Sequence, residues 1–143
     1  MQPRISVVTL GVSDLGVARK FYCDGLGWTA APSSNQHVVF IDVGALVLAL
    51  FERSDLAKDA HVRADGQGFG GITLAHNVGS KAEVDATIEF VRKASATILK
   101  EPADTFWGGY SGYFADPDGY PWEVAWNPFW PLDANGRVQL PKF

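Results

Sequence analysis

One carboxylate near the C-terminal end of the sequence is set among apolar and small residues. Glu123 lies in PWEVAW, where Trp122, Val124 and Trp126 alternate with Pro121, Glu123 and Ala125. Alternation with a period of two is typical of a β-strand, so one face of this strand is bulky and the other is small and carries the acid. Such a carboxylate predicts a pocket lining, where it can act as a general acid or base. The alternative is a structural role, in which Glu123 pairs with an arginine or with amides of the C-terminal segment.

The residue expected to face Glu123 is Tyr113. The turn sequence Asp116-Pro117-Asp118-Gly119 joins two strands, because proline presets φ and glycine accepts a positive φ. If Phe114 pairs with Trp122 across this hairpin, Tyr113 pairs with Glu123 on the small-residue face. We therefore predict a tyrosine hydrogen-bond donor beside the carboxylate. Ordinary packing of the ring in the core is the alternative.

Further candidate ligand contacts lie in a loop and at the start of a strand. Trp107 and Tyr110 lie in a segment interrupted by glycines, which can move over the mouth of a pocket. We expect Trp107 to stack on a ligand, unless it packs on a partner subunit. His37 precedes a strand and is expected near the pocket rim. No two of the histidines show the HxH or HxxxH spacing of a metal-binding pair.

These side chains are positioned by a strand–helix–strand–strand pattern. In the first half, residues 5–12, 38–43 and 46–51 are rich in β-branched and apolar residues and predict strands. Ser13 or Asp14 can cap a helix that ends at Gly25-Leu26-Gly27. A short helix is expected within residues 54–64, followed by a glycine-rich linker at residues 65–71.

The same order starts again after the linker. Residues 71–78 (GITLAHNV) resemble residues 6–13, and Ser80-Lys81-Ala82-Glu83 is a capping box before a helix. We predict an α+β fold of two βαβββ modules, at residues 1–64 and 65–127, related by pseudo-twofold symmetry within one structural domain. A mixed curved sheet encloses a pocket, and the helices lie on its outer face. The tail, residues 128–143, turns at Asn135-Gly136, buries Phe129 and Trp130, and packs on the body or on a partner subunit.

The parity of the strands predicts which residues line this pocket. Large residues point towards the helices, and the opposite face carries mostly small ones: Val7, Thr9, Gly11, Ala49, Phe51, Gly71, Thr73 and Ala75. Among them we expect Thr9, Phe51 and Thr73 to contact a ligand.

Composition and charge exclude several classes of function. The net charge of −4, without a basic block, argues against nucleic-acid binding. No apolar run reaches the roughly 18 residues of a membrane helix, and no signal peptide is visible, so a cytoplasmic protein is expected. The single Cys23 excludes an internal disulfide, and no glycine motif for a nucleotide cofactor is present.

Two signatures at the ends of the repeat resemble the vicinal oxygen chelate superfamily. The first is Val12-Ser13-Asp14-Leu15 with Phe21-Tyr22 and Leu26-Gly27-Trp28, and the second is YFADPDG at residues 113–119 with Trp122-Glu123-Val124. This superfamily includes glyoxalase I, extradiol dioxygenases, fosfomycin-resistance enzymes and bleomycin-binding proteins. The resemblance covers about residues 4–126 and implies the paired-module fold and a homodimer.

The resemblance also implies where a metal ion would be bound. The four ligand positions of the family's metal enzymes fall on Val7, Ala49, Gly71 and Glu123, and among these only Glu123 has a donor atom. A divalent cation takes three or more protein ligands, so we expect neither a metal nor another cofactor. Three interpretations stay open: a metal-free protein that binds a small organic molecule, a metal-free enzyme with Glu123 as general acid or base, and a metal-dependent lyase or dioxygenase whose ligands have moved.

Overall fold

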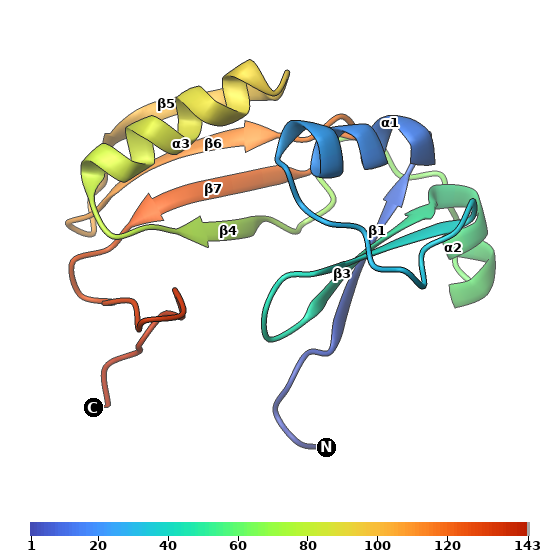
Figure 1. Ribbon diagram of the computed structural model, residues 1–143, viewed down its shortest axis with the longest axis horizontal. Helices are drawn as coiled ribbons and strands as arrows, with labels where there is room; N and C mark the ends of the chain where they lie inside the picture. The colour runs from blue at the N-terminus through green and yellow to red at the C-terminus, as the bar shows by residue number, and fades with distance from the viewer. Residues whose placement is uncertain (143) are drawn as a thin grey trace. The chain divides into compact units, whose positions relative to one another are not determined.

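The computed structural model describes residues 1–142. The chain forms two compact units, one spanning Met1–Gly70 and a second that begins at Gly71, each with its own sheet (Figure 1). The boundary lies at the end of the glycine-rich segment 65–71. The two units are described in turn below.

The first unit contains a three-stranded sheet and short helices. Its elements are β1 (Val7–Val12), α1 (Leu15–Arg19), a π-helical segment η1 (Lys20–Gly25), β2 (Val38–Asp42), β3 (Val47–Glu52) and α2 (Arg53–Ala60). The strand order is β1-β3-β2, with β1 parallel and β2 antiparallel to β3. Asp14 caps α1 by accepting a hydrogen bond from the Val17 N–H at 3.0 Å. An isolated antiparallel bridge pairs Ala30 with Ile41.

The core of the first unit follows the predicted alternation. The cross-strand rows place large apolar residues on one face of the sheet, and α1 contacts β2 and β3. At most 3% of each of these side chains is exposed: Leu10, Val39, Ile41, Leu48 and Leu50. The opposite face carries the row of Thr9, Ala49 and Phe40.

The second unit has the complete βαβββ order. Its elements are β4 (Leu74–Asn77), α3 (Lys81–Lys93), β5 (Thr97–Asp104), β6 (Tyr110–Ala115) and β7 (Pro121–Trp126), with strand order β4-β7-β6-β5. β4 runs parallel to β7, and the other neighbours are antiparallel. In Figure 1, α3 lies along one face of this sheet, in contact with β5, β6 and β7.

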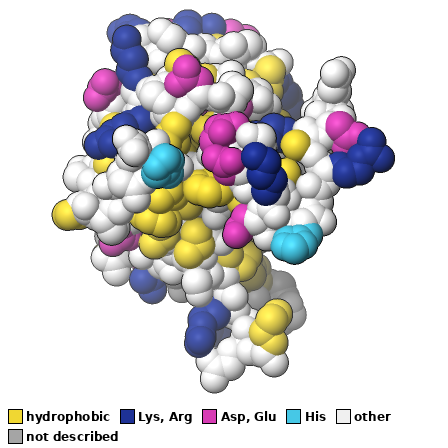
Figure 2. All heavy atoms as spheres, turned by 90° about the vertical axis from the view of Figure 1, so that its right-hand side faces the viewer, with side chains coloured by type: hydrophobic (Ala, Val, Ile, Leu, Met, Phe, Trp, Pro, Cys, Tyr) yellow, Lys and Arg dark blue, Asp and Glu magenta, His cyan; other side chains and the backbone are white. Residues whose placement is uncertain are grey.

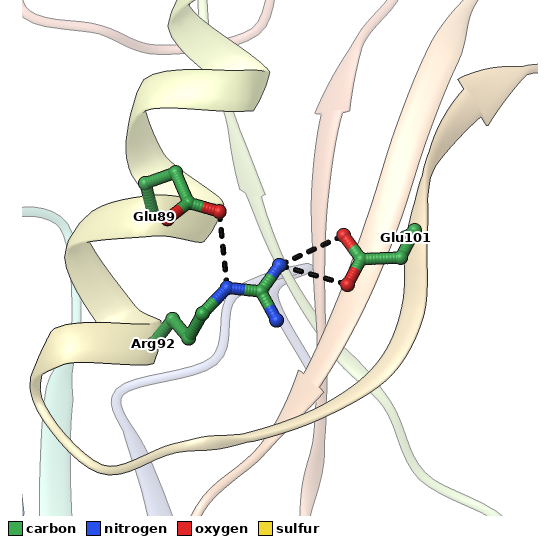
Figure 3. Close-up of polar contacts among 3 residues, drawn as sticks. All are labelled: Glu89, Arg92 and Glu101. Atoms are coloured by element: carbon green, nitrogen blue, oxygen red, sulfur yellow. Dashed lines mark hydrogen bonds and ion pairs between the residues drawn. The ribbon is translucent and has the colours of Figure 1, made fainter.

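Helix α3 is fixed at its start, along its buried face and near its end. Ser80 is the N-cap and accepts a hydrogen bond from the Glu83 N–H at 3.1 Å, which confirms the first half of the predicted capping box. The Glu83 carboxylate accepts its bond from the N–H of Gly79, one residue before the N-cap, and not from the Ser80 N–H. Val84, Ile88 and Val91 are buried. Near the end of the helix, Arg92 bonds both Glu89 and Glu101, and so ties α3 to β5 (Figure 3).

The predicted α+β class with mixed, curved sheets is confirmed, and some local expectations need correction. The strand expected at residues 71–78 begins only at Leu74, so Gly71 and Thr73 precede it. The tail does turn at Gly136, where φ is +78°, and Leu132 pairs with Val138. Within the single chain, 64% of Phe129 and 41% of Trp130 are exposed, so burial of these side chains against a partner subunit stays a prediction.

Candidate functional site

The hairpin of β6 and β7 brings Tyr113 and Glu123 together. In its register, Phe114 pairs with Trp122 and Tyr113 pairs with Glu123, as predicted. The Phe114 and Trp122 rings stack with centroids 6.1 Å apart and are nearly buried on the α3 side. Tyr113 and Glu123 are half-buried on the opposite face. The buried aromatic pair therefore fixes which face the polar pair occupies.

The chemistry of this polar pair is that of a phenol donor and a carboxylate acceptor. The pKa of Tyr113 is raised, first by partial burial and then by the charge of Glu123 and a hydrogen bond to it. Tyr113 therefore stays protonated at neutral pH and donates to the carboxylate. A carboxylate has several acceptor positions, so Glu123 can accept a further hydrogen bond from a ligand.

Two more residues lie in the same cross-strand row. Ala75 pairs with Glu123 on one side, and Lys100 pairs with Tyr113 on the other. Ala75 leaves space beside the carboxylate, and the exposed Lys100 adds a positive charge at the far end of the row. The sequence did not indicate Lys100 as a site residue, because β5 shows no alternation of apolar and polar residues.

Tyr110 lies on the other face of the sheet. It opens β6, pairs with Trp126, and donates a hydrogen bond from its hydroxyl to Asp85 of α3 at 2.7 Å. Lys81 lies 5.6 Å from the centre of the Tyr110 ring and 5.9 Å from that of Trp126. Tyr110 therefore does not share the face of Glu123, and its contact with a ligand stays a prediction.

Trp107 lies in the loop between β5 and β6. Its ring fills the space above Gly109, where an added Cβ would collide with it. The loop is closed by hydrogen bonds from the Gly109 N–H to the Thr105 hydroxyl, at 3.0 Å, and from the Thr105 N–H to the Gly109 carbonyl, at 3.0 Å. The half-buried indole is thus held by its own loop, and its stacking on a ligand stays a prediction.

The candidates of the first unit lie on or beside its sheet. Thr9 pairs with Ala49, and Phe51 pairs with Val38, so all four share the face opposite the large core residues. Thr9 is exposed, Phe51 is half-buried and Ala49 is 2% exposed. His37 is exposed just before β2, and its Nε2 lies 3.2 Å from the Gln36 side-chain nitrogen.

The residues at the four positions where the resemblance implies metal ligands do not fit a metal ion. Val7, Ala49 and Gly71 have no side-chain donor, so the carboxylate of Glu123 would be alone. Among residues 1–142, no group of three or more His, Cys, Asp or Glu side chains is arranged to hold a metal. A donor set of one carboxylate cannot support the family's metal chemistry.

The distribution of apolar side chains on the surface and along the helices is relevant to possible partners. Figure 2 shows a face on which apolar side chains gather, with acidic, basic and histidine side chains around them. Among the helices of residues 1–142, none has both the length and the apolar character needed to cross a membrane.

Known proteins of similar sequence and structure agree with the two signatures. The profile of the Glyoxalase/Bleomycin resistance protein/Dioxygenase superfamily matches residues 4–124. A glyoxalase-related enzyme from Fulvimarina pelagi is 35% identical, with a TM-score of 0.87 over 97% of this chain and 99% of that one. A glyoxalase/bleomycin resistance protein/dioxygenase from Nocardioides is 26% identical, with a TM-score of 0.75 over 99% and 91%.

A lactoylglutathione lyase from Agrobacterium tumefaciens is 25% identical, with a TM-score of 0.67 over 88% of this chain and 95% of that one. No protein of curated function matches the chain significantly. Because the family profile covers most of the sequence and the first of these structures is similar over nearly its whole length, the chain belongs to the glyoxalase/bleomycin resistance protein/dioxygenase superfamily.

Proposed function

We propose that the protein binds a small organic molecule at the face of the second unit that carries Glu123 and Tyr113, without the metal ion of its enzymatic relatives. The observation that supports this most directly is the polar pair itself. A half-buried carboxylate is held by a phenol on a face of mostly small residues, while three of the four positions where the resemblance implies metal ligands lack a donor. Keeping a partly desolvated carboxylate costs free energy, so its retention supports a contact with a ligand.

A metal assay tests the metal-free part of this proposal. The protein is purified without a metal-affinity column, and its content of Zn, Ni, Mn and Fe is measured. We expect clearly less than one equivalent, because one carboxylate cannot hold such an ion. A stoichiometric metal would overturn the proposal and indicate a metal-dependent enzyme with relocated ligands.

The binding part is tested with Glu123→Gln, which keeps the shape of the side chain and removes its charge. A library of small molecules is screened against the wild type by thermal shift, and each hit is titrated against both proteins. We expect the affinity of the variant to be lower by about tenfold or more, because a hydrogen bond to a charged group contributes about 1.5–3 kcal/mol. Hits whose affinity is the same in both proteins would place the binding elsewhere.

The second candidate is a metal-free enzyme in which Glu123 acts as general acid or base. It is favoured by the protonated Tyr113 next to the carboxylate, since a neutral donor can orient a substrate while the acid moves a proton. The lyase from Agrobacterium tumefaciens is one relative whose name implies catalysis. A substrate that Glu123→Gln binds normally but no longer converts would establish this alternative.

We also propose that the protein is a cytoplasmic homodimer. The dimer is supported by the apolar surface left exposed on the described chain, including Phe129 and Trp130 of the tail. A twofold dimer is the commonest oligomer of soluble proteins.

A further inference from the structure

A row of side chains crosses the sheet of the second unit on the face opposite α3. From β5 to β4, the neighbours in this row are Lys100, Tyr113, Glu123 and Ala75. Adjacent strands are about 4.8 Å apart, so roughly 10 Å separates the backbones of Lys100 and Glu123. A cation and a carboxylate thus lie on the two sides of a phenol in this row.

The position of Lys100 on this face is supported by its neighbours along β5. Ile98 pairs with Phe114, on the α3 side, and Glu101 bonds Arg92 of α3 at 2.8 Å. A register shift between Ile98 and Lys100 inserts one extra residue, which leaves Lys100 on the side of Tyr113. The irregularity of the strand therefore moves the lysine to the face of the polar pair.

The two charges of this row differ from the other charges near β5, because they are unpaired among the described residues. The other charges near β5 are used, because Arg92 pairs with Glu89 and Glu101, and Lys81 pairs with Asp104. Within residues 1–142, neither Lys100 nor Glu123 has an ion-pair partner. Both charges remain available to a ligand.

We propose that this row binds a zwitterionic small molecule, with the ammonium group of the ligand at Glu123 and its carboxylate or other anion at Lys100. The inference rests on the proposed function and names the class of ligand. Tyr113 holds one oxygen of Glu123, and the small Ala75 leaves room for an ammonium beside the carboxylate. A ligand with only a positive charge would be repelled by Lys100, and one with only a negative charge by Glu123, so a molecule with both charges complements the row best.

Three compounds of equal chain length test this inference by titration calorimetry: ε-aminocaproate, hexylamine and hexanoate. We expect ε-aminocaproate to bind at least about tenfold more tightly than either of the others, since only it has both an ammonium for Glu123 and a carboxylate for Lys100. Lys100→Met should remove its advantage over hexylamine, and Glu123→Gln should remove its advantage over hexanoate. Lys93→Met is the matched control, because Lys93 is an exposed lysine at the end of α3. It should leave all three affinities unchanged.

The outcomes separate this inference from the proposed function. If hexylamine binds as tightly as ε-aminocaproate, or if Lys100→Met binds like the wild type, the zwitterion inference is overturned. The same holds if only uncharged molecules bind in a way that depends on Glu123, although the proposed function then stands. If no compound of the charged series or of the screening library binds in a way that depends on Glu123, both fail.

Discussion

The Tyr113 phenol is the donor in the pair with Glu123, so its protonation state decides what the site offers to a ligand. Its pKa is raised by partial burial, and further by the charge and the hydrogen bond of Glu123. When the pKa of a group is higher in the folded protein than in the unfolded chain, the group contributes fully to stability at a pH below its unfolded-state pKa. This contribution is lost as the pH rises through the folded-state pKa. The pair is therefore intact at neutral pH and is lost only in the alkaline range.

Glu123→Gln should lower the pKa of Tyr113, because it removes the carboxylate charge next to the phenol. The pKa should stay above that of a free tyrosine, since partial burial is the larger cause and is unchanged. The measurement is an alkaline titration of phenolate absorbance, taken as a difference against Tyr113→Phe to exclude the other tyrosines. An unchanged Tyr113 pKa in Glu123→Gln would show that the two groups do not interact in solution.

Helix α3 stabilises the face of the sheet that lies behind the polar pair. Ile88 is 1% exposed, and the helix contacts β5, β6 and β7. Ile88→Ala should lower the free energy of unfolding by about 2–5 kcal/mol, because it removes buried methyl groups and leaves a cavity.

The matched control on the same helix is Phe90→Ala, because 52% of Phe90 is exposed. Its effect should stay within about 0.5 kcal/mol, as for most surface substitutions. Urea unfolding followed by circular dichroism measures both variants. Equal losses would contradict the placement of α3 with Ile88 towards the sheet.

The elements differed in how far the sequence predicted them. The hairpin of β6 and β7 was predictable to the register, because its turn sequence and the alternation of PWEVAW each point to the same pairing. β5 was not, since ILKEPAD has no regular alternation and contains Pro102. Such a strand is tolerated at the edge of the sheet, where one side of its backbone needs no partner. Lys100 was missed for this reason.

The face on which Tyr110 lies could have been predicted from the strand alternation, but the neighbouring glycines favoured a loop. For a loop residue, alternation along the chain does not predict which face of a sheet the side chain occupies. Once β6 begins at Tyr110, the pairing that sets Tyr113 opposite Glu123 also places Tyr110 opposite Trp126, on the α3 side. Extending the strand by the same alternation would have predicted its face.

At the scale of the whole chain, the repeat and the two signatures were sufficient to predict the family and the fold class. The ligand was not predictable, because this fold carries several chemistries and three of the four positions where the resemblance implies metal ligands have no side-chain donor. The candidate site of this chain is a row of polar side chains brought together by strand pairing between β5, β6 and β7. Such a row has no linear motif, since its members are separated by ten or more residues along the chain.

The tail presents two aromatic side chains to solvent although its turn is held by hydrogen bonds. The Asp133 carboxylate accepts hydrogen bonds from the N–H groups of Asn135 and Arg137, at 2.8 and 3.0 Å, and these bonds lower the pKa of Asp133. Phe129 and Trp130 nevertheless remain 64% and 41% exposed on the described chain. Exposed aromatic rings on a hydrogen-bonded segment are typical of a surface that a partner covers.

We expect the wild type to be a dimer by size-exclusion chromatography with light scattering. The double variant Phe129→Ser, Trp130→Ser should dissociate at concentrations at least about tenfold higher than those at which the wild type dissociates. The reason is that large aromatic side chains contribute a major part of the free energy of association. Phe90→Ser, on the exposed face of α3, is the control and should dissociate as the wild type does. A monomeric wild type would refute the proposed dimer, whereas a dimer that the double variant leaves intact would show that its interface lies away from the tail.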